Sequence, residues 1–512
     1  MAALSARIAP IKTSKNSYPI LLVMTVLLAG GATLVPISAS SAPETSALTL
    51  TPCRLEGFGG FRKIKAECGT LAAPLNPDEP DGTSIDLYVA RVPALTRTPA
   101  VSAFTYIAGG PGQASTEAYV SMREAFELIR RERDIILVDQ RGTGRSNRQQ
   151  CELPEDRRDY DLESWSPEDI AAFTRECLAA LGDGARYYTT SIAVEDLERL
   201  RQAFGYPQLD LYGISYGTRV AQHYLRRYPQ QVRSVILDGV VPVTMPLGPD
   251  IAINAQHALD QVFSRCAEDV PCTTAFGDIK NKFTELQNRL RSDPPTVSHP
   301  DPISGEPVES VVSHEHLHIA VRLMSYSPDT VSLLPLMIDA AFNGNYLPVA
   351  AQALLGIENL NNMLAYGMHN TVVCSEDTPF YEGYDVNRDL LEQSYMGIRS
   401  YQGLIDTCKD WPRGPVDTNF RQPFASNAPV LVLSGEADPV TPASYGEMVS
   451  DYLGNAEHIV IDGQGHGQAH VGCMPRLMAA FIADLDPPGL DTGCLDTQHA
   501  APFFTSYSGP EP

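Results

Sequence analysis

Residues 209–229 read LDLYGISYGTRVAQHYLRRYP, and this segment is the strongest indication of the fold class. Its first four residues form a short, mainly apolar run that is typical of a buried β-strand. Residues 218–228 then have a helical pattern, which Pro229 ends. Between the two stands the pentapeptide GISYG, residues 213–217. Its glycines permit a sharp strand-to-helix turn that lifts a serine hydroxyl clear of the sheet, so Ser215 is a candidate nucleophile.

The rest of the chain alternates between short strand patterns and helical patterns. Helical patterns, such as that of residues 194–204, separate apolar runs that are typical of strands covered on both faces. Strand, helix and strand in series predict an α/β fold with a mainly parallel sheet flanked by helices. The strand patterns lie at residues 85–92, 101–107, 134–138, 209–212, 232–237, 429–433 and 458–461.

The length of the chain predicts more than one structural unit. At about 150 residues per domain, 512 residues correspond to about three domains, or to one large domain with an insertion. Residues 245–420 favour an insertion, because they are largely helical in period and follow a different pattern from the rest. We therefore expect a signal peptide at 1–42, a core formed by 43–244 and 421–512, and a mostly helical cap at 245–420.

A serine nucleophile needs a general base, and the base needs a carboxylate that orients it. Both follow later strand patterns in the chain, in the order serine, acid, histidine. We predict that Asp438 fixes the tautomer of the imidazole and that His466 takes the proton from Ser215. The alternatives are Glu436 as the acid and His470 as the base.

An oxyanion hole needs two backbone N–H groups near the nucleophile. One is expected from Tyr216, the residue after the nucleophile. The other is expected from the glycine-rich loop GGPG at residues 109–112, which follows an early strand. Because glycine lets the backbone approach a substrate closely, we predict Gly110 as the second donor.

The segment HEHLH at residues 314–318 formally matches the zinc-peptidase motif His-Glu-x-x-His. A zinc peptidase that uses His314, Glu315 and His318 is therefore a further alternative. Such a site also needs a third ligand downstream, and the sequence offers no clear one. Ser313 has the character of an N-cap, which predicts an exposed helix start as the structural interpretation. We expect no metal and no cofactor.

The first 42 residues have the composition of a secretory signal peptide. Three basic residues and no acidic one precede an apolar stretch at 20–37, and small residues follow it. An uncleaved membrane anchor is the alternative, although Gly30, Gly31 and Pro36 weaken it as a stable helix. We expect cleavage, a secreted or periplasmic location, and no stable membrane partner.

The cysteines are consistent with export. All ten follow the predicted signal peptide and fall into couples that are close in sequence, which indicates up to five disulfides. The couples are Cys53 and Cys68, Cys151 and Cys177, Cys266 and Cys272, Cys374 and Cys408, and Cys473 and Cys494. The net charge of -24 disfavours a phosphate backbone as a ligand, so no nucleic acid partner is expected.

Three motifs occur in order along the chain: GGPG at 109–112, DQRGTGRS at 139–146 and GISYG at 213–217. Together they resemble the prolyl aminopeptidase family of α/β hydrolases. The cysteines and the segment DPVTP at 438–442 are more similar to the tripeptidyl aminopeptidase-like branch of that family. The resemblance covers roughly residues 50–495.

This resemblance implies an α/β-hydrolase fold with a helical cap, and a serine exopeptidase that removes residues from the N-termini of peptides. It implies that Ser215, Asp438 and His466 are catalytic and that the partner is a peptide substrate. It also implies that acids of the cap, here Glu376 and Asp377, bind the substrate amine; a solvated turn is the alternative for these two residues.

One residue departs from the pattern of the family. The prolyl branch usually has a histidine before GGPG, whereas this chain has Ala108, so a strict preference for proline is not implied. The family also contains esterase-like members. An esterase of the same fold is therefore the alternative activity.

Overall fold

The computed structural model describes residues 48–152, 165–300 and 305–510. The predicted signal peptide at 1–42 lies outside the described residues. Within them, no helix is both long enough and apolar enough to span a membrane.

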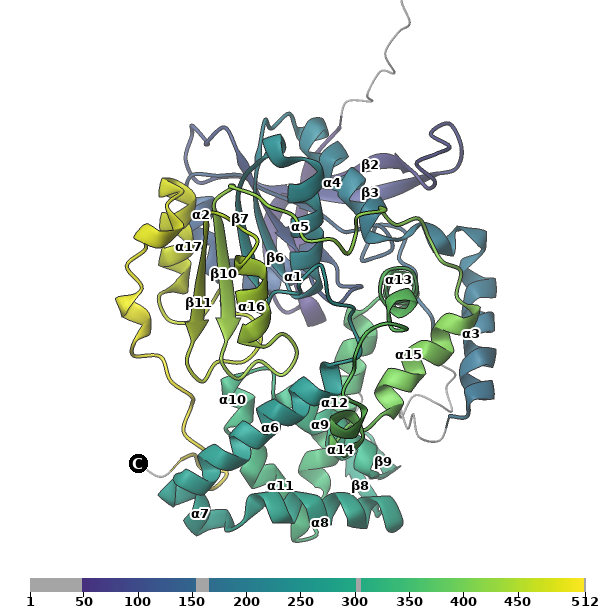
Figure 1. The fold of residues 1–512 in the computed structure, drawn as a ribbon, viewed down its shortest axis with the longest axis vertical. Helices are drawn as coiled ribbons and strands as arrows, with labels where there is room; N and C mark the ends of the chain where they lie inside the picture. Colours follow the sequence, from purple (N-terminus) through teal and green to yellow (C-terminus); the bar gives the residue numbers. More distant parts are fainter. Residues whose placement is uncertain (1–47, 153–164, 301–304, 511–512) are drawn as a thin grey trace, which may run out of the picture. The chain divides into compact units, whose positions relative to one another are not determined.

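The core of the described chain is a nine-stranded sheet with the order β1-β2-β3-β5-β4-β6-β7-β10-β11. Strands β6, β7, β10 and β11 of this sheet are labelled in Figure 1. The six strands from β5 to β11 in this order are parallel, and β1, β2, β3 and β5 pair antiparallel with their neighbours on that side. The mainly parallel sheet predicted from the sequence is confirmed. The strands are β1 (Thr51–Glu56), β2 (Lys63–Pro74), β3 (Ser84–Val92), β4 (Ala103–Ile107), β5 (Ile135–Val138), β6 (Leu209–Ile214), β7 (Val232–Asp238), β10 (Val430–Gly435) and β11 (Ala456–Ile461).

Strands β1 and β2 have no counterpart among the predicted strands. They form the edge of the sheet, and many of their side chains are exposed, including charged ones. An edge of this kind has no continuous apolar run, which is the pattern that identified the central strands. The disulfide between Cys53 and Cys68 joins the two strands.

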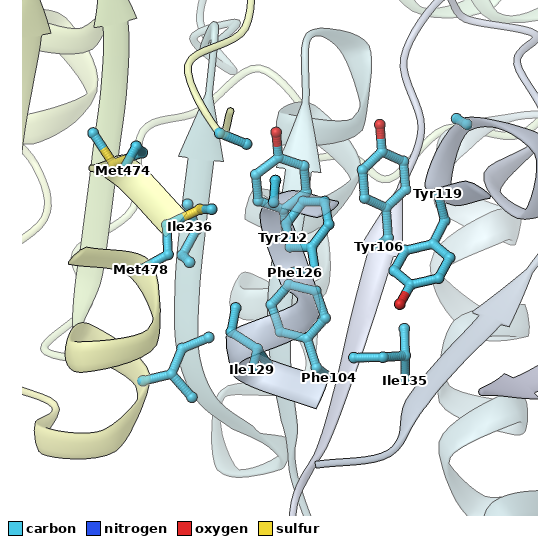
Figure 2. Packing of buried hydrophobic residues seen from close by; sticks show 14 of the residues in the cluster. Phe104, Tyr106, Tyr119, Phe126, Ile129, Ile135, Tyr212, Ile236, Met474 and Met478 are labelled. Atoms are coloured by element: carbon cyan, nitrogen blue, oxygen red, sulfur yellow. The ribbon is translucent and has the colours of Figure 1, made fainter. Parts of the chain in front are cut away.

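One face of the sheet packs on an aromatic layer. Phe104 and Tyr106 of β4 point to this face together with Tyr212 of β6, and Phe126 packs edge-on against Tyr212 with ring centroids 4.9 Å apart (Figure 2). Helices α1 (Ser115–Met122), α2 (Glu127–Arg130) and α17 (Met474–Asp484) cover this layer. Burial of such large rings contributes much of the hydrophobic stabilisation of a core.

The opposite face of the sheet carries smaller aliphatic residues. Ala103 and Ile107, the residues that alternate with Phe104 and Tyr106 along β4, belong to this second layer. Helices α4 (Thr190–Phe204), α5 (Tyr216–Arg227) and α16 (Ala443–Ser450) cover it, and α5 begins directly after β6. Helices on both faces account for strands that are apolar without alternation.

The chain leaves the sheet after β7 and returns at β10. Helices α6 to α15 lie in between, and α6 to α12 share an apolar cluster of their own. All of them fall within 245–420, whose limits as a cap stay a prediction. The elements are α6 (Ile251–Glu268), α7 (Val270–Phe276), α8 (Ile279–Ser292), β8 (Thr296–Pro300), β9 (Pro307–Val311), α9 (His314–Met324), α10 (Pro328–Val331), α11 (Leu334–Phe342), α12 (Leu347–Met363), α13 (Tyr366–Val372), α14 (Arg388–Gln393) and α15 (Arg399–Asp410).

The hairpin of β8 and β9 was not predicted, because its side chains are largely exposed and its segment is rich in proline and aspartate. Helix α3 (Pro167–Leu181) precedes α4 and is joined to the loop after β5 by a disulfide. All five predicted cysteine couples form disulfides: Cys53–Cys68, Cys151–Cys177, Cys266–Cys272, Cys374–Cys408 and Cys473–Cys494.

Candidate active site

Ser215 occupies the turn between β6 and α5 and has a backbone conformation that is rare for a residue with a side chain. Its φ is 55° and its ψ is -126°. Its N–H donates to Asp238 O at the end of β7, at 2.9 Å. A conformation of this kind costs about 1–3 kcal/mol and persists only where the surroundings hold it.

The two glycines that flank this turn are required by packing. A Cβ on Gly213 would lie 2.4 Å from Gly217 O, and a Cβ on Gly217 would lie 2.2 Å from Ile107 O. Both distances are far below van der Waals contact, so neither position accepts a side chain. The glycines of the pentapeptide therefore allow β6, α5 and β4 to approach closely beneath Ser215.

Asp438 and His466 come from loops that follow β10 and β11, the last two strands of the sheet. The Nδ1 atom of His466 lies 2.8 Å from Oδ2 of Asp438. The other carboxylate oxygen, Oδ1, accepts hydrogen bonds from the N–H groups of Val440 and Thr441 at 2.8 and 2.9 Å. The predicted acid and base are thus brought together: the side chain of Asp438 is fully buried, and that of His466 is only 10% exposed.

The electrostatics of the pair favour an ion pair when His466 is protonated. Burial opposes the charged form of Asp438, but His466 and the two N–H donors outweigh it and hold the pKa of Asp438 below its ordinary value. Burial likewise opposes imidazolium, yet the carboxylate of Asp438 outweighs this and raises the pKa of His466. His466 is therefore a stronger base than a histidine in water.

The alternative acid and base lie elsewhere. Glu436 is exposed, and its carboxylate accepts a hydrogen bond from Gly463 N–H at 3.0 Å. His470 is also exposed. The carboxylate that receives the imidazole of His466 is that of Asp438, so the geometry favours the first choice at both positions.

The turn at the end of β7 connects the nucleophile with the base. Ser215 donates to the carbonyl of Asp238, and a Cβ on the next residue, Gly239, would lie 2.9 Å from Cε1 of His466. Ser215 and His466 therefore converge on the same two-residue turn. Gly239 has a φ of 61°, and its lack of a side chain leaves room for the imidazole.

Two residues at this site have no role in the sequence-based prediction. The hydroxyl of Thr441 donates to Oδ2 of Asp438 at 2.8 Å and lies 3.2 Å from Nδ1 of His466. The carboxylate of Asp238 accepts the N–H groups of Gln468 and Ala469, which follow His466 in its loop, at 2.8 to 3.0 Å. Thr441 could have been found three residues after Asp438, whereas the Asp238 contact crosses 230 residues and leaves no local signal.

The glycine-rich loop lies against the nucleophile. A Cβ on Gly109 would lie 3.0 Å from Cβ of Ser215, and the next residue, Gly110, has a φ of 108°. The backbone of this loop is therefore close to the serine and adopts a conformation that glycine favours. The roles of Gly110 and Tyr216 as oxyanion donors stay a prediction.

Glu376 lies in a π-helical turn, Val373–Asp377, and its side chain is fully buried. Its Oε1 accepts the N–H of Thr190 at 2.6 Å, and its Oε2 accepts the Thr190 hydroxyl at 2.8 Å. That hydroxyl lies 2.6 Å from the Tyr216 hydroxyl, next to the nucleophile. Burial raises the pKa of Glu376 to about 7, although Arg219 lowers it.

Asp377 is also fully buried and is held by cations. Its carboxylate accepts hydrogen bonds from Nη1 of Arg219 at 3.0 and 3.2 Å, from Leu247 N–H at 2.8 Å, and from Arg421. Arg219 belongs to α5, one turn after Ser215. The solvated turn considered for Glu376 and Asp377 is therefore wrong, because both carboxylates are buried against the helix that carries the nucleophile. Their binding of a substrate amine stays a prediction.

The segment with the zinc-peptidase pattern begins α9, and Ser313 is its N-cap as predicted. The expected exposure is wrong: the side chains of His314, His316 and His318 are all buried. Burial, together with His314, lowers the pKa of His318 to about 3, and Nε2 of His318 lies 2.7 Å from the Gln287 amide. Among the described residues, no group of three or more His, Cys, Asp or Glu side chains could hold a metal ion.

The fold and this site agree with the comparison to known families. The family described as alpha/beta hydrolase fold matches residues 104–472, so the chain belongs to the α/β-hydrolase family. With its nucleophile turn, acid and base in the order of that family, it is a serine hydrolase of this fold.

Three relatives show which activities occur among similar chains. The serine protease Hip1 of Mycobacterium tuberculosis is 26% identical over 475 residues, covering 86% of this chain and 89% of Hip1. Carboxylesterase B of the same species is 27% identical over 469 residues, covering 84% and 86%. The tripeptidyl aminopeptidase of Streptomyces coelicolor is 29% identical over 189 residues, covering 34% and 35%.

Proposed function

We propose that the protein is an exported serine aminopeptidase that releases residues or short peptides from peptide N-termini through an acyl-enzyme on Ser215. The observation that carries the acyl-enzyme mechanism is the pair of Asp438 and His466 beside the strained turn of Ser215. The similarity to a serine protease over most of the chain, and to a tripeptidyl aminopeptidase over part of it, supports peptide cleavage. Export is supported by the five disulfides.

The mechanism follows from the hydrogen bond of the imidazole. Because Nδ1–H of His466 donates to Asp438, the lone pair on Nε2 is left to accept a proton. His466 takes the proton of Ser215 as the hydroxyl attacks the substrate carbonyl. The N–H groups of Gly110 and Tyr216 hold the resulting oxyanion. His466 then protonates the leaving amine and, in the second half of the reaction, activates water to hydrolyse the acyl-enzyme.

An esterase of the same fold is the second candidate, and the similarity to carboxylesterase B over 84% of the chain favours it. The same nucleophile and base serve both reactions, so the triad geometry does not separate them. The preferred leaving group separates the two activities, because an esterase turns over short acyl esters faster than aminoacyl amides.

The first test is labelling of the purified mature protein with a fluorophosphonate, with and without a chelator, and mapping of the modified residue. We expect labelling at Ser215 that the chelator does not change, and none in the Ser215→Ala variant, which should still fold and be secreted. Loss of activity on chelation without labelling would contradict a serine mechanism. The kcat/KM values for free and N-blocked aminoacyl amides and for short acyl esters then distinguish the aminopeptidase from the esterase.

A further inference from the structure

A cavity of about 560 Å³ is linked to the glycine-rich loop through one of its lining residues. The end of β1 and the residues after it, the first turn of α1, and the end of α12 line it. One lining residue, Met363 of α12, accepts a hydrogen bond on its sulfur from the Gln113 side chain at 3.2 Å. Gln113 also donates its backbone N–H to Gly109, which contacts Ser215. The cavity therefore adjoins the loop that lies against the nucleophile.

Glu117, in the first turn of α1, faces this cavity and differs from the other acids near the site. Its side chain is half-buried. Within the described part of the chain, its backbone carbonyl accepts a hydrogen bond from Ser121, whereas its carboxylate has neither a hydrogen bond nor an ion pair. Burial and the charge of Asp139 raise the pKa of Glu117, and Arg148 and Arg145, which lower it, do not offset this. Glu56, the other acid in the lining, is already paired with Lys63 at 2.6 Å.

The same cavity offers hydrogen-bond donors. The guanidinium of Arg145 lies 4.9 Å above the ring of Tyr88, and its Nη1 donates to the Tyr88 hydroxyl at 3.1 Å. Over the described residues it forms no ion pair with a carboxylate, so its remaining N–H groups are available to a ligand. The cavity thus combines an acceptor carboxylate with a fixed donor, and its volume is in the usual range for ligand sites.

We propose that this cavity binds the amino-terminal segment of a peptide substrate, with the carboxylate of Glu117 accepting hydrogen bonds from the free ammonium group. Arg145 donates to a peptide carbonyl of the same segment. The inference rests on the proposed aminopeptidase function and names the residue that recognises the free terminus. Three extended residues span about 10 Å, so a short peptide links an anchored terminus to a more distant scissile bond.

The hydrogen bonds of the three acids favour Glu117 over Glu376 and Asp377 as the residue that binds the ammonium group. Both oxygens of Glu376 and both oxygens of Asp377 accept donors from the protein, and neither side chain is exposed. An ammonium group would have to displace those donors. At Glu117 it would instead supply the partner that a half-buried carboxylate lacks.

The test compares Glu117→Gln with the wild type on an unblocked tripeptide aminomethylcoumarin amide and on its N-acetyl form. We expect kcat/KM for the unblocked substrate to fall by about tenfold, mainly through KM, because a charge-assisted contact is lost. The value for the acetylated substrate should stay the same. Glu124→Gln is the matched control, since Glu124 follows α1, is 57% exposed, pairs with Arg62 and does not line the cavity.

Three results would overturn the assignment. The first is an unchanged preference for the free amine in Glu117→Gln, and the second is an equal loss on both substrates, which indicates a structural role. The third is a preference that survives in Glu117→Gln but is lost in Glu376→Gln, which would assign binding of the substrate amine to Glu376. If the wild type itself shows no preference for the free amine while the fluorophosphonate still labels Ser215, the aminopeptidase function fails and the inference fails with it.

Discussion

The Nδ1 atom of His466 lies 2.8 Å from Oδ2 of Asp438, and this contact sets the pH at which the base works. Because the carboxylate raises the pKa of His466 above its ordinary value of 6.5, the imidazole loses its proton only at higher pH. We predict that kcat/KM falls on the acid side with an apparent pKa above 6.5. A pH profile of kcat/KM measures it, and an acid limb below 6.5 would contradict the assignment of His466.

A second titrating group requires a control for that profile. Burial raises the pKa of Glu376 to about 7, so its titration also falls near neutral pH. If His466 is responsible for the acid limb, the limb persists in Glu376→Gln with its apparent pKa above 6.5. Disappearance of the limb in that variant would assign the titration to Glu376 instead.

Replacement of Asp438 by Asn should remove most of the activity. The amide cannot accept Nδ1–H with the strength of a carboxylate, and it favours the wrong tautomer of His466. We expect kcat to fall by about 10⁴, the size of the effect of the same substitution in another serine hydrolase. Labelling by the fluorophosphonate should slow in parallel. A variant with nearly normal kcat would mean that another residue orients the imidazole.

Replacement of Thr441 should lower kcat less than replacement of Asp438 does. Its hydroxyl donates to the same carboxylate oxygen that receives His466, so Thr441→Val removes one donor without emptying the site. We predict a fall in kcat of about tenfold, typical of one lost hydrogen bond to a charged group, with KM little changed. Thr441→Ser should restore most of the activity. If Thr441→Ser loses as much activity as Thr441→Val, the hydroxyl alone does not account for the effect, because serine keeps the hydroxyl and lacks only the methyl group.

Glu376 should also link stability to pH. Its pKa is about 7 in the folded state, against an ordinary value of 4.5, so the native state holds its proton more tightly than the unfolded state does. This contribution to stability is complete below pH 4.5 and is lost as the pH rises to about 7, by an amount on the order of 3 kcal/mol. Chemical denaturation at pH 5 and pH 8 measures it. The fall should be smaller in Glu376→Gln, and an equal fall in both proteins would exclude Glu376 as its origin.

The sequence predicts those features of the fold and the site that depend on residues close together in the chain. The glycines beside Ser215 directly follow or adjoin the strand before it, and each polar loop directly follows its own strand, β10 or β11; all of these features appear in the structure. Strand β1 was missed because an exposed edge has no apolar run. The contact of Asp238 with the loop of His466 was missed because it joins residues 230 positions apart. Tertiary contacts of this length have no local pattern.

The turn at Gly239 provides the sharpest test of how closely the base is positioned. A Cβ there would lie 2.9 Å from Cε1 of His466, whereas a Cβ on Gly277, with a similar φ of 63°, would meet no atom within 4 Å. Alanine is strained at both positions, because both have a positive φ that residues with a side chain rarely adopt. Only Gly239→Ala should displace the imidazole, so we predict a fall in kcat of about 10²-fold for this variant and almost none for Gly277→Ala. Measurement of kcat and the melting temperature for both variants tests this prediction. Equal losses of activity would show that backbone strain, and not contact with His466, is responsible.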